Sequence, residues 1–141
     1  MSKRTFIWFG ILVVVLAVAI PWLAFRSRGD AATGPQEVPA SLEHGQEIFQ
    51  TNCGTCHTLY AAGTDGNYGP NLDELVASSG PPEGEPEQIE QIVKGRETQV
   101  LEAVEKGRNN PDTPGRMPAG ILNKEQAKEV AEFVANTAGE G

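Results

Sequence analysis

The chain of 141 residues has room for one domain of ordinary size and a short appendage, but not for two full domains. The first 30 residues hold four of its 11 basic and one of its 19 acidic side chains, so residues 31–141 keep seven basic and 18 acidic ones, a formal charge of −11. Binding to nucleic acid requires Lys and Arg clusters that displace counterions from phosphates, so this balance argues against a nucleic-acid partner and favours partners with a basic docking surface.

The first predicted element is a membrane-spanning helix. Residues 6–25 are apolar at all but two positions, and twenty helical residues measure about 30 Å, the thickness of the hydrocarbon core of a bilayer. Trp8 and Trp22 lie near the two ends of this run, where indole rings favour the membrane interface. We therefore assign residues 1–26 to a signal-anchor helix that crosses the cytoplasmic membrane once. Cleavage of a signal peptide at the small residues 17–19 is the alternative.

A flexible linker is predicted after the span. Residues 27–40 combine Gly, Pro, Ala and mixed charges without a periodic apolar pattern. Such a coil averages roughly 20 Å from end to end and reaches at most about 46 Å. Three positive groups precede the span and two follow it, which slightly favours a cytoplasmic amino terminus. The domain predicted at residues 41–138 would then lie on the periplasmic, or extracytoplasmic, side.

The two ends of this domain show the clearest helix signals. A first helix is predicted to begin at Ser41, whose hydroxyl can accept from a free backbone N–H, and to end near Cys53. A closing helix of about twelve residues is predicted after Asn123 and Gln126, which form a capping-box pair, with Gly139 as its stop. Apolar residues recur at helical spacing in both segments, which indicates an all-α domain.

Shorter helices are predicted in the middle of the domain. Residues 71–78, 87–94 and 97–106 each have a helical pattern, and glycine separates the last two, so we expect two successive short helices there. Residues 78–87 are rich in Pro, Gly and Glu and are predicted to form a surface loop. No alternating apolar pattern indicates a strand.

The segment Cys53-Gly54-Thr55-Cys56-His57 contains both cysteines of the chain. Two thiols three residues apart can face the same way on a turn and bond to the two vinyl groups of one porphyrin, while the adjoining His reaches the iron. The pattern is therefore typical of c-type haem attachment. A redox-active dithiol, half of a zinc site and a structural disulfide are the alternatives. The dithiol would need a strand–turn–helix setting, and zinc would need four ligands, for which only His57 and the distant His44 remain; we expect His44 to face solvent.

Several motifs, taken in their order, resemble the class I (mitochondrial-type) monohaem cytochromes c. The likeness runs from about Ser41 to Ala138 and comprises a first helix with Gly45 and Phe49, the Cys53–His57 motif, Gly69-Pro70-Asn71-Leu72, Arg116-Met117-Pro118-Ala119 and a last helix with Phe133. The resemblance implies the class I fold, in which a few helices surround one covalently attached haem c. It also implies that the first and last helices cross where Gly45 permits close approach to Phe133.

The same resemblance implies how the iron is held. His57 and Met117 would be its axial ligands, and the backbone carbonyl of Pro70 would accept from the His57 ring. Met117 lies in a loop rich in Gly and Pro, a context that favours ligation over core filling. His/Met ligation raises the reduction potential and leaves no open position for dioxygen or peroxide. Tyr60 and Tyr68 are expected to pack and not to bind the haem carboxylates.

These inferences predict an electron carrier and not an enzyme. Its expected place is between a quinol-oxidising complex and a terminal oxidase. The alternative is a fixed cytochrome c subunit of a larger respiratory or photosynthetic complex. A haem enzyme or gas sensor would require that Met117 does not bind the iron. The expected partners are redox proteins with a basic docking surface, together with the membrane through the N-terminal helix. Neither nucleic acid nor a small-molecule substrate is expected.

Overall fold

The computed structural model describes residues 8, 12–20, 37–109 and 115–140. The chain divides into two compact units, residues 1–33 and residues 34–141. In the first unit residues 12–20 are helical. Across the described ranges no helix is both long and apolar enough to cross a membrane. Residues 1–7, 9–11 and 21–26 of the predicted anchor, and residues 27–36 of the predicted linker, lie outside the described residues.

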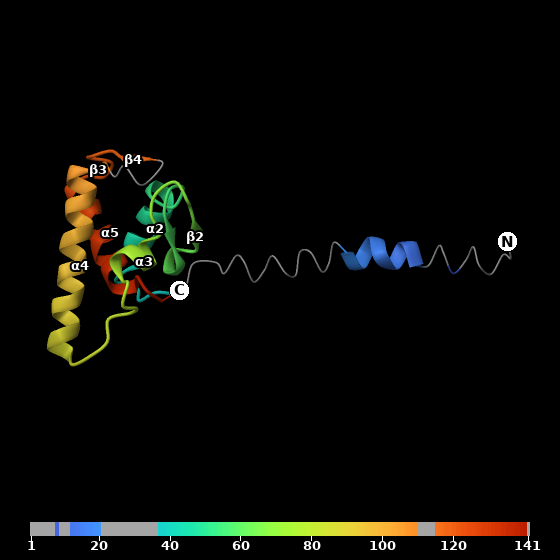
Figure 1. Cartoon of the computed structure of the whole chain (residues 1–141), viewed down its shortest axis with the longest axis horizontal. Helices are drawn as coiled ribbons and strands as arrows, with labels where there is room; N and C mark the ends of the chain where they lie inside the picture. The colour runs from blue at the N-terminus through green and yellow to red at the C-terminus, as the bar shows by residue number, and fades with distance from the viewer. Residues whose placement is uncertain (1–7, 9–11, 21–36, 110–114, 141) are drawn as a thin grey trace. The chain divides into compact units, whose positions relative to one another are not determined.

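Helices make up most of the second unit, as expected (Figure 1). The helices of its described residues are α2 (Glu43–Asn52), the 3₁₀ turn η1 (Tyr60–Ala62), α3 (Leu72–Val76), α4 (Pro86–Lys106) and α5 (Lys124–Thr137). The same residues contain two-residue strands that were not predicted: β1 (Thr58–Leu59), β2 (Thr64–Asp65), β3 (Arg108–Asn109) and β4 (Arg116–Met117). They form two antiparallel ribbons, β1–β2 and β3–β4. A pattern of period two cannot be recognised in strands this short, which is why sequence analysis missed them.

The core is centred on the contact between α2 and α5, where the predicted close approach is confirmed. A Cβ added to Gly45 would overlap the backbone oxygen of Glu129 and lie 2.9 Å from Cβ of Phe133. The missing side chain lets Phe49 meet Phe133 edge to face, with ring centroids 6.0 Å apart. Both rings are fully buried. At the rim of this contact, Nδ1 of the exposed His44 lies 3.0 Å from a carboxylate oxygen of Glu129.

The prediction of two short helices in the middle of the domain is wrong, because α4 runs without a break from Pro86 to Lys106. Gly95 lies inside it and ends nothing. A glycine in a helix interior costs only about 1 kcal/mol relative to alanine, and burial of Val100 and Val104 in the core outweighs that cost. The helix begins with a capping box formed by Glu85 and Gln88. Figure 1 shows α4 packed along α5 as the longest helix of the unit.

The predicted start of the last helix is confirmed, whereas that of the first helix differs in its capping residue. At α5, Oδ1 of Asn123 accepts from the backbone N–H of Gln126 at 2.9 Å and Oε1 of Gln126 accepts from that of Asn123 at 3.2 Å, which confirms the capping box. At α2, the predicted cap by Ser41 is wrong. Leu42 is the N-cap residue, and its apolar side chain offers no atom to cap the helix. The N–H of Leu42 closes a tight turn on the carbonyl of Pro39 at 2.7 Å, just before the helix.

Two buried charged residues tie the carboxyl-terminal segment to the rest of the domain, and sequence reasoning missed both. The guanidinium of Arg96 donates to the backbone oxygens of Gly80 at 2.7 Å and Ala138 at 3.3 Å. The carboxylate of Asp73 accepts from the backbone N–H groups of Tyr60 and Gly139, both at 2.9 Å. Burial lowers the pKa of Arg96 below its usual value. These bonds hold the end of α5 beside α3 and the loop before α4.

Candidate functional site

A cavity of about 360 Å³ opens in the second unit between the helices and the β3–β4 ribbon. Its walls are mainly apolar. The apolar side chains that line it are Phe49, Leu72, Leu75, Val76, Val100, Val104, Ile121, Val130 and Val134. Such a concave, apolar site with a few polar groups is the usual form of a binding site for a small molecule or cofactor.

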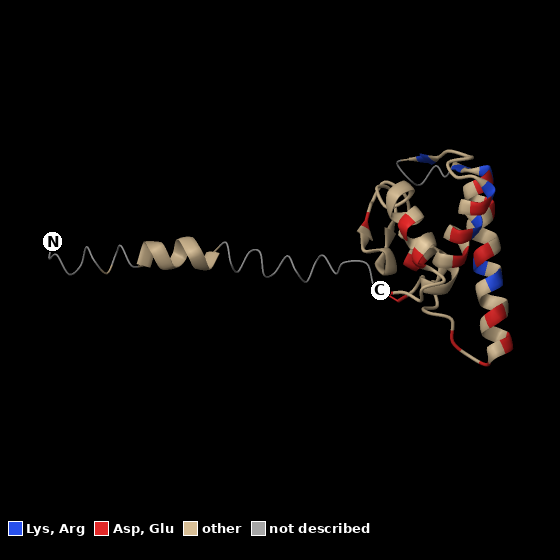
Figure 2. Cartoon of the chain, turned by 180° about the vertical axis from the view of Figure 1, so that it is seen from behind, with Lys and Arg blue, Asp and Glu red and all other residues tan. Residues whose placement is uncertain are grey.

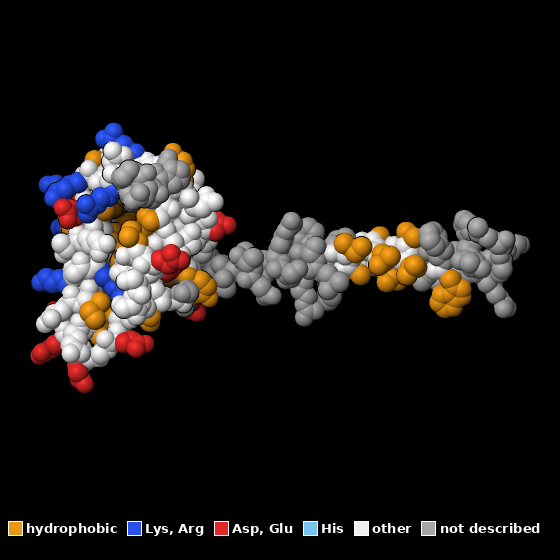
Figure 3. Space-filling model, in the orientation of Figure 1, with side chains coloured by type: hydrophobic (Ala, Val, Ile, Leu, Met, Phe, Trp, Pro, Cys, Tyr) orange, Lys and Arg blue, Asp and Glu red, His pale blue; other side chains and the backbone are white. Residues whose placement is uncertain are grey.

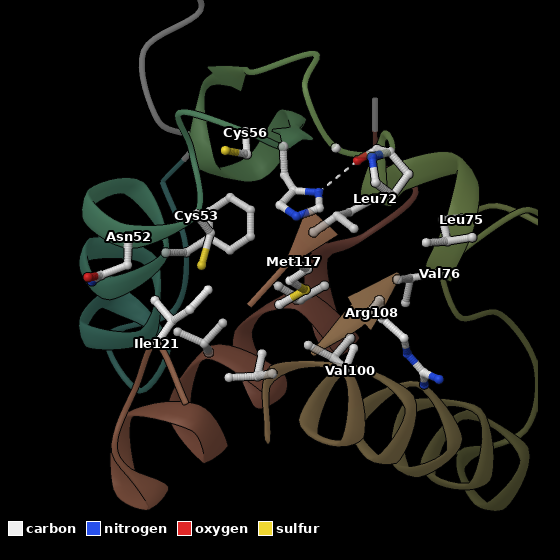
Figure 4. Close-up of a pocket in the computed structure, with 18 of the residues that line it drawn as sticks. Asn52, Cys53, Cys56, Leu72, Leu75, Val76, Val100, Arg108, Met117 and Ile121 are labelled. Atoms are coloured by element: carbon white, nitrogen blue, oxygen red, sulfur yellow. Dashed lines mark hydrogen bonds between the residues drawn. The ribbon is translucent and has the colours of Figure 1, made fainter. Parts of the chain in front are cut away.

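The two thiols stand at one side of this cavity because α2 ends at them. Cys53 is the C-cap residue of α2, and the next turn is closed by bonds from the N–H groups of Cys56 and His57 to the carbonyl of Cys53, each 3.0 Å. Figure 4 shows both sulfur atoms on the same side of the cavity. The turn therefore presents two thiols to one ligand.

The state of the thiols bears on the alternative functions of the motif. Burial, with a smaller contribution from Cys56, raises the pKa of the Cys53 thiol to about 11, whereas redox-active dithiols have a lowered pKa. No disulfide joins Cys53 to Cys56. Within the described ranges no three His, Cys, Asp or Glu side chains come together as a metal-binding group.

The imidazole of His57 is fixed from one side. Its Nδ1 donates to the backbone oxygen of Pro70 at 2.9 Å, the bond drawn dashed in Figure 4. A Cβ on Gly69 would lie 2.5 Å from Cε1 of the ring, so the glycine allows the imidazole to lie against the backbone. With Nδ1 engaged, Nε2 is left to act as a ligand, the arrangement usual for a metal-binding histidine.

Met117 reaches the cavity from the β3–β4 ribbon. It lies in the middle of Figure 4, with Cys53 to one side and Leu75 and Val76 to the other. The backbone before it is covered by Tyr68, since a Cβ on Gly115 would overlap the tyrosine ring. The β3–β4 ribbon thus brings the side chain of Met117 to the cavity.

All five residues predicted for the site therefore line one cavity: Cys53, Cys56, His57, Pro70 and Met117. Among the lining residues that sequence reasoning did not identify is Arg108, which the pairing of β3 with β4 brings beside Met117. The expectation that His44 faces solvent agrees with its exposed position beside Glu129 on the α2–α5 rim.

The residues present fit a covalently attached tetrapyrrole. The apolar walls suit a flat hydrophobic macrocycle, the paired thiols suit its attachment, and a neutral imidazole and a thioether suit iron. Haem attached in this way supplies a centre that gains and loses one electron.

Comparison with known proteins supports this chemistry. The family model described as cytochrome c matches residues 42–138, more than two thirds of the chain and all of the cavity-lining residues. No curated protein matches the chain. The chain accordingly belongs to the cytochrome c family, whose domain binds haem c covalently and transfers electrons through it.

Proposed function

We propose that this cytochrome carries single electrons through a haem linked to Cys53 and Cys56, with His57 and Met117 as axial ligands of the iron. The observation that carries the proposal is the shared cavity, which unites the attachment motif with a thioether sixty residues further along the chain. Apart from the two thiols that attach the haem, nothing else among the described lining residues offers a comparably soft ligand.

Each of these residues has a defined task. The Met117 thioether is neutral and soft, so it favours ferrous over ferric iron and raises the reduction potential. The carbonyl of Pro70 fixes the imidazole plane and increases the basicity of His57. With two protein ligands the iron has no vacant position for dioxygen, peroxide or another small substrate, so electron transfer is the remaining chemistry.

The ligand assignment is tested by the oxidised and reduced optical spectra of the Met117→Ala variant. We expect the sulfur-to-iron charge-transfer band to disappear while the porphyrin stays attached. Ile121→Ala is the matched control, because Ile121 lines the same cavity and offers no ligand atom. A Met117→Ala protein that keeps the band, or a wild-type ferrous protein that binds carbon monoxide rapidly, would contradict the assignment.

We further propose that the N-terminal segment anchors the protein in the cytoplasmic membrane with the haem domain on the periplasmic side. The apolar run at residues 6–25 supports this proposal, as does the need of haem attachment for reduced thiols outside the cytoplasm. A tethered carrier could move between a quinol-oxidising complex and a terminal oxidase. Partition of the full chain into carbonate-washed membranes is expected, and recovery in the soluble fraction would refute the anchor.

The acidic surface supports partners with a basic docking surface. Figure 2 shows acidic side chains spread over the helices of the domain, with basic ones along α4 and at the end of the domain where β3 lies. Long-range attraction to a basic partner should weaken as salt screens it, so electron-transfer rates should fall with ionic strength. Rates independent of salt would refute this steering. A stoichiometric partner that copurifies in mild detergent would instead favour the second candidate function, a fixed subunit of a larger complex.

A further inference from the structure

The wall of the cavity is open to solvent in places. Three of the side chains that line it are exposed by 39% or more: Tyr68, Leu75 and Ile121. Figure 3 shows hydrophobic side chains at the surface beside the Lys and Arg side chains gathered at the end of the domain where β3 and β4 lie. Small ligands from solvent therefore have a route to the edge of the cavity, and a thioether bound to iron inside it has to compete with them.

The strand that carries Met117 gives it little support of its own. A soft, neutral thioether binds ferric iron less strongly than ferrous iron, so in the oxidised protein the bond depends on how firmly the chain holds the sulfur. The β3–β4 ribbon has only two residue pairs, Arg108 with Met117 and Asn109 with Arg116. Contacts made by the neighbouring backbone therefore matter for the position of Met117.

One such contact is made by the ring of Tyr68, two residues before Met117. A Cβ built on Gly115 would overlap Cδ1 and Cε1 of the ring and lie 2.9 Å from Cζ. Any side chain at position 115 would displace the ring, so the contact requires the glycine. The tyrosine is 53% exposed, which places this contact at the surface of the domain and not in its core.

The main chain at Tyr68 belongs to the segment that holds the other proposed ligand. The N–H of Gly69 donates to the carbonyl of Cys56 at 2.7 Å, and the ring of His57 lies where a Cβ of Gly69 would be. The carbonyl of Pro70 accepts from Nδ1 of His57 at 2.9 Å. Tyr68 is thus fixed through its backbone on the imidazole side, and its side chain packs on the chain that leads to the thioether.

We propose that Tyr68 is a positioning residue for Met117, because its ring holds the backbone at Gly115 against the segment that fixes His57. This contact slows the departure of the thioether from ferric iron. The inference rests on the proposed function, since it requires that Met117 binds the iron. Tyr68 acts through the backbone of Gly115.

The test measures how fast imidazole binds to the ferric, haem-loaded full chain in mild detergent, followed by loss of the sulfur-to-iron charge-transfer band. At saturating imidazole the rate equals the rate at which the thioether leaves the iron, whereas at low concentration it also depends on entry of the ligand. In Tyr68→Ala we expect the saturating rate to rise about tenfold, on the order of the loss of a partly buried aromatic contact. Tyr68→Phe keeps the ring and should retain the wild-type rate.

Tyr60→Ala is the matched control. It removes the same side chain from another exposed position, on η1, and Tyr60 does not line the cavity. We expect its saturating rate to equal that of the wild type. An unchanged rate in Tyr68→Ala, or an equal increase in both alanine variants, would overturn the proposal. An increase confined to low imidazole would also overturn it, because the ring would then only block entry.

A second variant covers the case in which Tyr68→Ala does not retain haem. Gly115→Ala leaves the tyrosine in place, but its Cβ drives the ring from the backbone. We expect the saturating rate to rise in this variant as well, and a rate equal to that of the wild type would overturn the proposal.

The optical spectrum of the wild-type protein keeps the two hypotheses apart. Absence of attached haem or of the charge-transfer band there would contradict the proposed function. With both present, an unchanged saturating rate in Tyr68→Ala contradicts only the assignment of Tyr68.

Discussion

Alanine in place of Gly45 should destabilise the domain, whereas alanine in place of Gly95 should stabilise it. Both glycines lie inside helices and have negative φ angles, so the two substitutions gain the same helix propensity, about 1 kcal/mol. Their surroundings differ. A Cβ at Gly95 meets nothing within 4 Å, whereas a Cβ at Gly45 meets the Glu129 backbone and Cβ of Phe133. Comparison of Gly45→Ala with Gly95→Ala therefore separates the effect of packing on stability from the effect of helix propensity.

The distances set the size of the effect. Carbon atoms in ordinary contact lie about 3.5–4.0 Å apart, but the new Cβ of the Gly45→Ala variant would start at 2.9 Å from Cβ of Phe133 and 3.0 Å from the carbonyl carbon of Glu129. The helices α2 and α5 must separate by roughly 0.5–1 Å to restore ordinary contact. Overpacking against backbone atoms should lower the free energy of unfolding by an amount near the upper end of the usual range, about 3 kcal/mol. After the gain in helix propensity, the Gly45→Ala variant should lose about 2 kcal/mol of stability.

Urea unfolding of the haem-loaded chain, followed by far-UV circular dichroism in mild detergent, measures both variants. With a slope of about 2 kcal/mol per molar urea, the midpoints of the two variants should differ by roughly 1.5 M. The wild type should lie between them. A Gly45→Ala midpoint at or above the wild type would refute the packing argument. A Gly95→Ala midpoint below it would refute the view that α4 merely tolerates its glycine.

Three further predictions concern the cavity and the carboxyl-terminal segment. Gly69→Ala should displace the His57 ring, because the new Cβ would lie 2.5 Å from Cε1 of that ring. A changed midpoint potential and shifted haem-methyl NMR signals would show the displacement. Unchanged spectra would contradict the close contact between Gly69 and the ring. Arg96→Met should cost about 2–3 kcal/mol in urea unfolding, since two backbone carbonyls lose a charged donor; a loss below about 0.5 kcal/mol, on the order of a neutral surface change, would contradict this. Burial, with a smaller contribution from Asp73, raises the pKa of Glu140, so the folded state holds that proton more tightly and stability falls as pH rises through the titration. Glu140→Gln should therefore stabilise the protein slightly at neutral pH, but not in acid below the usual carboxyl pKa. A variant that is less stable than the wild type at neutral pH would contradict the predicted direction of the effect.

The parts of the fold that were predicted correctly depend on residues close together in the chain. The capping box of Asn123 and Gln126 is a pattern of four residues, and the attachment motif spans five. Gly45 was placed at the helix contact through a family resemblance, and the structure supplies the reason in the backbone and side-chain atoms that its Cβ would strike. In the capping box, the attachment motif and the contact at Gly45, the structure that the neighbouring residues favour is also the one that the tertiary packing requires.

The parts that were not predicted depend on distant contacts. Gly95 has the local character of a helix stop, and only the burial of Val100 and Val104 makes the longer helix favourable. Nothing near Arg96 in the chain indicates that it is buried, because one of its carbonyl partners lies 42 residues away. The β3–β4 ribbon has two residues in each strand, too few for a periodic signal, so the presence of Arg108 at the cavity was not foreseen.

The register of the β3–β4 ribbon also determines whether the side chain of Met117 faces the cavity. A slip of the pairing by one residue would reverse the faces, so the side chain of Met117 would leave the cavity. The proposed thioether ligand would then be lost from the site. Insertions or deletions of one residue next to β4 should consequently remove the proposed contribution of the Met117 thioether to the reduction potential in a single step, whereas changes of two residues preserve the alternation.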